Sequence, residues 1–159
     1  MLTAATAAFL SMISYAEGTN IGEQGYAVTF DYHIIRDFDK HPNVAIIGSK
    51  YVSTAAGRYQ FIKATYDEMQ ERCKDAIPDF TPTSQDNAAV CMLNMKGVNH
   101  VNPIETEFAF SEEVDKVSKI WASLPGAGYG QPERKLGELW RVYREELTTG
   151  KGREENGKD

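Results

Sequence analysis

Residues Phe9–Glu17, with the sequence FLSMISYAE, decide how this chain begins to fold. Apolar side chains recur here at helical spacing and predict a helix with one face in a core; they are Phe9, Met12, Ile13 and Ala16. Glu17 continues this stripe, and Gly18, a residue that commonly ends helices in a left-handed conformation, follows it directly. The pattern therefore places the Glu17 carboxylate on the buried side of a helix, at its C-terminal end.

Both features of this position disfavour the Glu17 anion. Burial removes solvent from the charged form, and the C-terminal end of the helix dipole is already negative. A raised pKa is therefore expected for Glu17, which is what a general acid needs near neutral pH. The alternative is a frayed helix end from which Glu17 points into water.

Length and composition predict one globular domain over residues 1–147. The chain has 159 residues, of which 42% are hydrophobic, and this is enough for one well-buried core. The net charge of -6 argues against a nucleic-acid-binding protein. Apolar stretches fall short of the about 20 residues that span a bilayer, so stable membrane association is not expected. The first helix lacks the basic start of a signal peptide, which favours synthesis in the cytoplasm.

The cysteines and histidines do not form a metal-binding pattern. Cys73 and Cys91 are far apart in the sequence, and two buried thiols are favoured over a disulfide. The three histidines, His33, His41 and His100, are scattered. We expect neither a metal site nor a cofactor.

A β-rich lobe is predicted over about residues 19–53. Tyr26–Phe30 and Tyr32–Ile35 are rich in β-branched and aromatic residues and predict a hairpin with Asp31 near its turn. Val44–Ile47 predicts a third short strand.

The remainder of the chain predicts helices. Apolar stripes run from Ile62 to Cys73 and from Ala88 to Met95, the second with Thr83 as N-cap and Gly97 as its stop. Ser111 is the expected N-cap of a helix ending before Pro125, and Pro132 the start of the last helix. Its polar continuation, residues 148–159, is expected to be disordered.

Residues 55–60, with the sequence AAGRYQ, predict a sugar-binding segment. Gly57 allows close backbone approach, Tyr59 offers a ring, and Arg58 and Gln60 offer polar groups for hydroxyls. The alternative is an ordinary helix start with Tyr59 in the core.

Residues 122–131, with the sequence ASLPGAGYGQ, predict a loop of special backbone angles around an exposed Tyr129. A phosphate-binding loop is the tempting alternative. Such a loop would follow a strand and carry a Lys-Ser or Lys-Thr pair, and neither is found here.

Four motifs in this order resemble the lambda-type phage endolysins. They are SYAEGT at 14–19, TAAGRYQ at 54–60, FTPTSQD at 80–86 and IWASLPGAGYGQ at 120–131. The resemblance covers about residues 7–147. That family is a lysozyme-like group that cleaves bacterial peptidoglycan as lytic transglycosylases.

The resemblance implies an α+β, lysozyme-like fold with a helical lobe, a small antiparallel β lobe and a glycan cleft between them. It implies that Glu17 is catalytic and that substrate is bound by Tyr26, Arg58, Tyr59, Gln60, Tyr129 and Gln131. It also implies a monomer without metal or cofactor, which waits in the host cytoplasm. A membrane-permeabilising holin-type protein would then release it to the periplasm.

The chain departs from the family pattern at Ala27, where the lambda endolysin carries an acidic residue, and over residues 98–110. Loss of this acid favours a transglycosylase that works with Glu17 alone. A hydrolytic muramidase would need a second carboxylate, for which Asp31, Asp37 and Asp39 are the candidates. A third possibility is a glycan-binding relative that has lost the reaction, although Glu17 is present.

Overall fold

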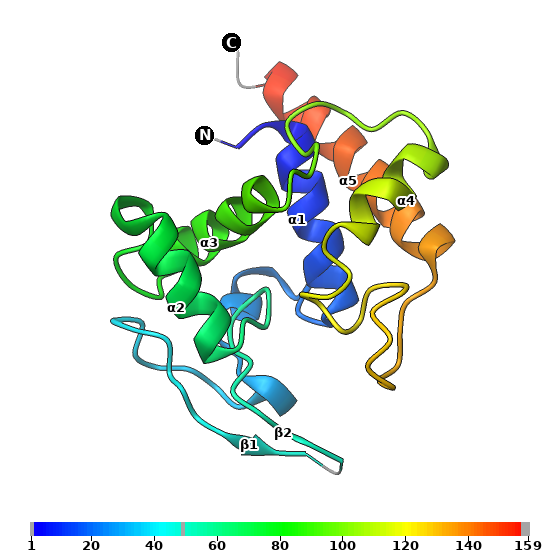
Figure 1. The fold of residues 1–159 in the computed structure, drawn as a ribbon. Coiled ribbons are helices and arrows are strands. Elements are labelled where there is room, and N and C mark those ends of the chain that lie inside the picture. The colour runs from blue at the N-terminus through cyan, green and yellow to red at the C-terminus, as the bar shows by residue number, and fades with distance from the viewer. Residues whose placement is uncertain (1, 49, 157–159) are drawn as a thin grey trace. The chain divides into compact units, whose positions relative to one another are not determined.

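The computed structural model describes residues 2–48 and 50–156 and is mainly helical, as predicted (Figure 1). The expected α+β composition is confirmed, since a single two-stranded antiparallel sheet accompanies the helices in the described residues. The α-helices are α1 (Ala4–Ala16), α2 (Lys63–Arg72), α3 (Pro82–Met95), α4 (Glu107–Asp115) and α5 (Leu136–Asn156). The 3-10 turns are η1 (Gly22–Ala27), η2 (Phe30–Tyr32) and η3 (Lys74–Ala76), and the strands are β1 (Ile46–Ile47) and β2 (Val52–Ser53).

The chain divides into two compact units. One unit consists of Met1–Ala16 with Leu93–Asp159, and the other is Glu17–Met92. The boundary falls directly after α1, so the predicted lobe over 19–53 is part of a longer unit that also holds α2 and most of α3. None of the described helices has the length and apolar character needed to cross a membrane.

An aromatic cluster forms the core of the first unit, where α1 packs on α5 (Figure 1). Phe9 of α1, on the predicted apolar stripe, lies 6.2 Å from Phe110 of α4 and 6.3 Å from Tyr143 of α5, between ring centroids. Trp140 stacks on Tyr143 with centroids 5.8 Å apart. Tilted and edge-on contacts of this kind add to the stability gained by burying the rings.

Glycine ends α3 as the sequence predicted. Gly97 has a φ of 68°, and the Val98 amide donates to the Leu93 carbonyl at 2.9 Å, which satisfies a carbonyl at the helix end. Helix α3 begins at Pro82, one residue before the predicted cap Thr83. Thr81, and not Thr83, accepts from the helix through its hydroxyl, which lies 3.4 Å from the Ser84 amide.

The last two helices also begin elsewhere than predicted. The N-cap of α4 is Thr106, whose hydroxyl accepts from the Ala109 amide at 3.1 Å, and the expected cap Ser111 lies inside the helix. Helix α5 begins at Leu136, four residues after Pro132. Where a disordered tail was expected, α5 continues to Asn156, and residues 157–159 lie outside the described part of the chain.

The predicted hairpin of Tyr26–Phe30 and Tyr32–Ile35 is wrong. Residues 22–27 and 30–32 form 3-10 turns, and only a single bridge joins Val28 to Ile34. Asp31 and Tyr32 both have positive φ angles, 63° and 61°, which turn the chain back at once and leave no room for a ladder. The predicted third strand is confirmed in part, since Ile46 and Ile47 pair with Ser53 and Val52.

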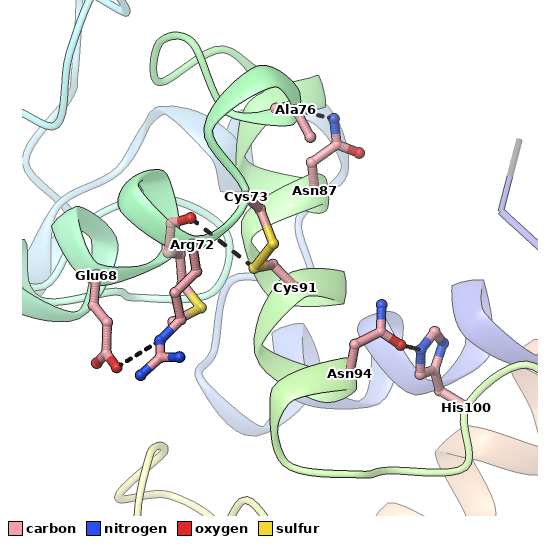
Figure 2. The surroundings of a disulfide bond; sticks show 9 residues. Glu68, Arg72, Cys73, Ala76, Asn87, Cys91, Asn94 and His100 are labelled. Carbon is pink, nitrogen blue, oxygen red and sulfur yellow. Dashed lines mark hydrogen bonds and ion pairs between the residues drawn. A yellow bond between two sulfur atoms is a disulfide. The ribbon is translucent and has the colours of Figure 1, made fainter.

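Cys73 and Cys91 form a disulfide, so the prediction of two free thiols is wrong (Figure 2). Cys73 directly follows α2, and Cys91 lies within α3. The hairpin-like path from α2 through η3 to α3 brings their Cα atoms to 6.4 Å, which is within the range that a disulfide requires. The bond ties the two helices of the second unit together.

Reduction of this disulfide should destabilise the protein. It closes a loop of 18 residues, for which chain entropy gives about 3 kcal/mol of stabilisation. Urea unfolding with and without a phosphine reductant measures the difference. The double variant Cys73→Ala/Cys91→Ala is the control, because its free energy of unfolding should not respond to the reductant.

A buried histidine holds the loops of the second unit in place. His41 is 2% exposed, and its two ring nitrogens have partners that fix the neutral form: Nδ1 accepts from the Asn43 amide at 3.0 Å, while Nε2 lies 2.7 Å from the Phe61 carbonyl. Burial lowers the pKa of His41. Burial also lowers the pKa of His100 in the first unit.

Stability should therefore fall in mild acid. The unfolded chain binds protons at the ordinary histidine pKa of about 6.5, while the folded chain binds them only at lower pH. The free energy of unfolding should be greatest above about pH 6.5 and decline as the pH drops below that value. Denaturant unfolding between pH 7.5 and 5 measures this decline. His41→Gln should reduce it, whereas His33→Gln, at an exposed position, is the matched control; an equal decline in both variants would contradict the role of His41.

Candidate active site

Glu17 lies at the junction between α1 and the second unit. Helix α1 ends at Ala16, Glu17 is the first residue of the turn that follows, and Gly18 has a φ of 74°. The predicted helix end at Gly18 is confirmed. The Glu17 side chain is half-buried. Its burial is therefore intermediate between the two predicted alternatives, a buried helix face and a helix end that points into water.

The turn after Glu17 is fixed by two hydrogen bonds within the second unit. The Tyr32 hydroxyl donates to the Gly18 carbonyl at 2.9 Å, and the Thr19 hydroxyl donates to the Arg58 carbonyl. The positive φ of Gly18 favours glycine in this turn, and a Cβ atom there would lie 2.7 Å from the Tyr32 hydroxyl oxygen and displace it. Glu17 thus stands on a backbone whose position depends on the segment around Arg58.

A cation lies at the C-terminal end of α1 in the first unit. Arg134 donates from Nε to the Ala16 carbonyl at 3.4 Å, and its guanidinium lies 5.1 Å from the centre of the Tyr15 ring. Positive charge at this end of a helix offsets the negative end of the dipole. Arg134 and Ala16 are 118 residues apart, so no local sequence pattern predicts this contact.

Residues 55–60 form a tight loop and not a helix start. Gly57 has a φ of 79°, Gln60 has a φ of 46°, and the chain returns so that Ala56 pairs with Phe61. The Gln60 side-chain amide donates to the Gly57 carbonyl at 2.8 Å. Tyr59 is 1% exposed, so the expectation that its ring could lie in the core is confirmed.

Two tyrosine hydroxyls converge on one carboxylate at this loop. Tyr59 donates to Asp86 Oδ1 at 2.6 Å, and Tyr26 donates to Oδ1 at 2.9 Å and Oδ2 at 3.1 Å. The Arg58 guanidinium lies over the Tyr26 ring at 5.0 Å from its centre. Burial and then the Asp86 charge raise the pKa of Tyr26 to about 12, so its hydroxyl stays a neutral donor.

Gln85 holds the same loop through its backbone. Its amide oxygen accepts from the Arg58 amide at 2.9 Å, and its amide nitrogen donates to the Phe80 and Tyr26 carbonyls at 2.8 and 3.1 Å. A Cβ atom at Gly57 would lie only 2.2 Å from Gln85 Oε1. Sequence reasoning did not place Gln85 or Asp86 in the candidate site, although both end the motif FTPTSQD.

Two charged side chains that flank the glycine-rich loop of the first unit bind its backbone. The Glu133 carboxylate accepts from the Gly126 and Gly128 amides, each at 2.9 Å, and these bonds lower the pKa of Glu133. Lys119 donates to the Ala127 carbonyl at 2.6 Å. The loop amides that could bind a phosphate are therefore occupied by a protein carboxylate.

This loop presents Tyr129 to solvent, as the sequence predicted. Its ring is 55% exposed, while its hydroxyl donates to the Lys119 carbonyl at 2.7 Å and the Lys119 ammonium lies 5.7 Å from the ring centre. Gln131 is half-buried nearby in the sequence. The Tyr129 ring is thus exposed, while its hydroxyl and its face both contact Lys119.

The predicted site residues divide between the two units. Glu17, Tyr26, Arg58, Tyr59 and Gln60 belong to the second unit, and Tyr129 and Gln131 belong to the first. The candidate second carboxylates, Asp31, Asp37 and Asp39, are all exposed. No group of three or more potential metal ligands occurs within residues 2–48 and 50–156.

Comparison with known proteins gives one consistent result. The Endolysin family model matches residues 7–150. The chain is 35% identical to the endolysin of Escherichia phage lambda over 144 residues, which is 87% of this chain and 88% of that protein. It is 34% identical to the endolysin of Escherichia phage P2 over 154 residues, covering 87% and 90% of the two chains.

Comparison with solved structures leads to the same family. Bacteriophage lambda lysozyme complexed with a chitohexasaccharide superposes with a TM-score of 0.81 at 33% identity, covering 92% of this chain and 96% of that one. A second structure of lysozyme from bacteriophage lambda gives 0.75 over the same shares. The fold is therefore lysozyme-like, and the chain belongs to the Endolysin family.

Proposed function

We propose that this protein degrades bacterial peptidoglycan and thereby lyses the host cell. Its substrate is the glycan strand, and the bond cleaved is the β-1,4 linkage between N-acetylmuramic acid and N-acetylglucosamine. The similar lambda lysozyme was solved in complex with a chitohexasaccharide, an oligomer of N-acetylglucosamine, and this supports a glycan as the substrate. The reaction proposed is lytic transglycosylation.

The observation that carries the proposal is the link between Glu17 and the Arg58 loop. Thr19, two residues after Glu17, donates to the Arg58 carbonyl, so an acid and a cationic, sugar-compatible segment share one rigid framework in the second unit. Precise placement of an acid relative to bound substrate is the main requirement of general acid catalysis.

The predicted binding residues take different parts in this proposal. Arg58 and Gln60 are half-buried, and their polar groups are the ones suited to sugar hydroxyl and acetamido oxygens. Tyr26 and Tyr59 are buried and serve as the support beneath them. In the first unit, the fixed, exposed ring of Tyr129 is suited to pack on a pyranose face, with Gln131 beside it in the sequence.

In the proposed mechanism Glu17 acts twice. As an acid it protonates the glycosidic oxygen, and the bond to C1 of muramic acid breaks. As a carboxylate it then takes the proton from the muramic 6-hydroxyl, whose oxygen closes on C1. The product is a 1,6-anhydro sugar, water is not consumed, and neither metal nor cofactor is needed.

The hydrolytic alternative requires a second carboxylate near the bond. Asp37 accepts from the Asp39 amide at 2.9 Å, which is a local turn contact, and Asp31 occupies a turn position with positive φ. These roles favour structural functions for both residues. They support the single-acid mechanism over hydrolysis.

The proposed setting is that of a phage lysis protein. The protein, a monomer, stays in the host cytoplasm until a holin-type protein permeabilises the membrane, and it then reaches the wall from the periplasm. The Cys73–Cys91 disulfide is compatible with this final compartment, because disulfides persist in an oxidising periplasm.

Glu17→Gln should abolish lysis while the fold is kept. Glutamine retains the shape of the side chain but cannot donate the proton, and general acid–base catalysis is worth about 10²–10⁴-fold in rate. Turbidity clearing of purified sacculi measures activity, and circular dichroism measures folding. Glu23→Gln, in the exposed 3-10 turn of the same unit, is the matched control and should clear sacculi at the wild-type rate. Undiminished clearing by Glu17→Gln would remove Glu17 from the mechanism.

Product analysis separates transglycosylation from hydrolysis. Every new muramic terminus should be a 1,6-anhydro end, lighter by one water than the hydrolytic product and resistant to borohydride. Digestion in water enriched in heavy oxygen, followed by mass spectrometry, provides the second measurement. Heavy oxygen at the new muramic C1 would mean that water attacked, and the two-carboxylate mechanism would replace the one proposed.

A further inference from the structure

We infer that Asp86 of α3 is a positioning residue for glycan binding, acting through Tyr26 and Tyr59 on the Arg58 guanidinium. The inference rests on the proposed function and extends it to a residue that lies outside the predicted site.

The Asp86 carboxylate is committed to two neutral donors. Its Oδ1 accepts from Tyr59 at 2.6 Å and from Tyr26 at 2.9 Å, and its Oδ2 accepts from Tyr26 at 3.1 Å. Both tyrosines are buried, at 1% and 8% exposure, and both hydroxyls donate to this one carboxylate. A half-buried aspartate with this pattern of contacts organises its neighbours and has little freedom to act on substrate itself.

Arg58 depends on the tyrosine pair for its orientation. Its guanidinium lies 5.0 Å from the centre of the Tyr26 ring, and its Nε is buried without a hydrogen-bond partner in the described part of the chain. No protein carboxylate fixes the guanidinium through that nitrogen. The stacking contact with Tyr26 is therefore a main constraint on where the cation points, and Asp86 fixes the Tyr26 ring through its hydroxyl.

The backbone of the same segment is held independently by the neighbouring residue. Gln85 binds the Arg58 amide and the Tyr26 carbonyl. A change at Asp86 that leaves Gln85 intact should thus release the side chains while the loop stays in place. Because Gln85 binds the backbone and Asp86 binds the side chains, a change at Asp86 should weaken substrate binding without a general loss of structure.

The test is Asp86→Asn, compared with wild type on purified sacculi. The amide keeps one acceptor oxygen, but it replaces the second oxygen that accepts from Tyr26 with a donor NH2 group and removes the negative charge. Hydrogen bonds to charged groups are the stronger ones. We expect the apparent KM to rise about tenfold, which corresponds to about 1.4 kcal/mol of binding, with kcat nearly unchanged. The dissociation constant for chitohexasaccharide, measured by calorimetry in the Glu17→Gln background, should rise by the same factor.

Two readouts distinguish positioning from a structural role. Alkaline titration of tyrosine absorbance should show Tyr26 ionising at lower pH in Asp86→Asn, because the carboxylate charge helps to raise its pKa. In a double-mutant cycle, Asp86→Asn should add little to the KM of Tyr26→Phe, since that variant has already lost the hydroxyl that Asp86 binds. Asp67→Asn is the matched control, because Asp67 pairs with Lys63 on exposed α2 of the same unit and should leave KM unchanged.

The outcomes separate this inference from the proposed function. If wild type neither clears sacculi nor binds chitohexasaccharide, both fail. If wild type does both and a folded Asp86→Asn matches it in KM and dissociation constant, the inference alone is overturned. Should Asp86→Asn not fold, Tyr26→Phe and Tyr59→Phe each remove one of the hydrogen bonds, and an unchanged KM in both would overturn the inference equally.

Discussion

The side chains of Gln85 and Asp86, in the second turn of α3, bind a segment of the second unit that has little regular secondary structure of its own. Between Glu17 and Phe61 the chain forms short 3-10 turns, isolated bridges and a two-residue hairpin, so many backbone polar groups lack ladder partners. Gln85, 1% exposed, makes two hydrogen bonds to that backbone, at Tyr26 and Arg58, and Asp86 binds two tyrosines. Because buried polar groups must be satisfied, losing either side chain would leave several groups unpaired at once.

The parts that sequence predicted well are those governed by local rules. The stretch from Phe9 to Ala16 is a helix, as the spacing of its apolar residues predicted, although α1 is buried on most of its sides and not on one face alone. Gly18 and Gly97 end helices because both adopt positive φ. Helix starts were less predictable. Ser and Thr residues stand both just before and inside the first turns of α3 and α4, so the sequence offers more than one cap candidate. The true caps, Thr81 and Thr106, lie two and five residues before those expected.

The predictions that were wrong depended on long-range contacts. Tyr26 has strand-like neighbours in the sequence, yet its conformation follows a carboxylate 60 residues away. The disulfide depended on how α2 and α3 approach, which spacing alone does not reveal. For the candidate site, residue chemistry predicted Glu17 and the Arg58 loop, and these assignments stay predictions. It did not point to Gln85, Asp86 or Arg134, whose contacts join segments distant in the chain.

The glycine-rich loop shows that the amino-acid composition of a loop does not by itself predict which ligand the loop binds. Three glycines with free amides could bind an anion, and the sequence argued against a phosphate only from context. In the structure Glu133 fills that place, since its carboxylate accepts from two of the loop amides. The loop also carries Tyr129, whose exposed ring is held through its hydroxyl by the Lys119 carbonyl. A stiff aromatic surface loses little entropy when a sugar packs on it, whereas an anion would have to displace a carboxylate already in place. This favours a glycan over any phosphorylated ligand at the loop.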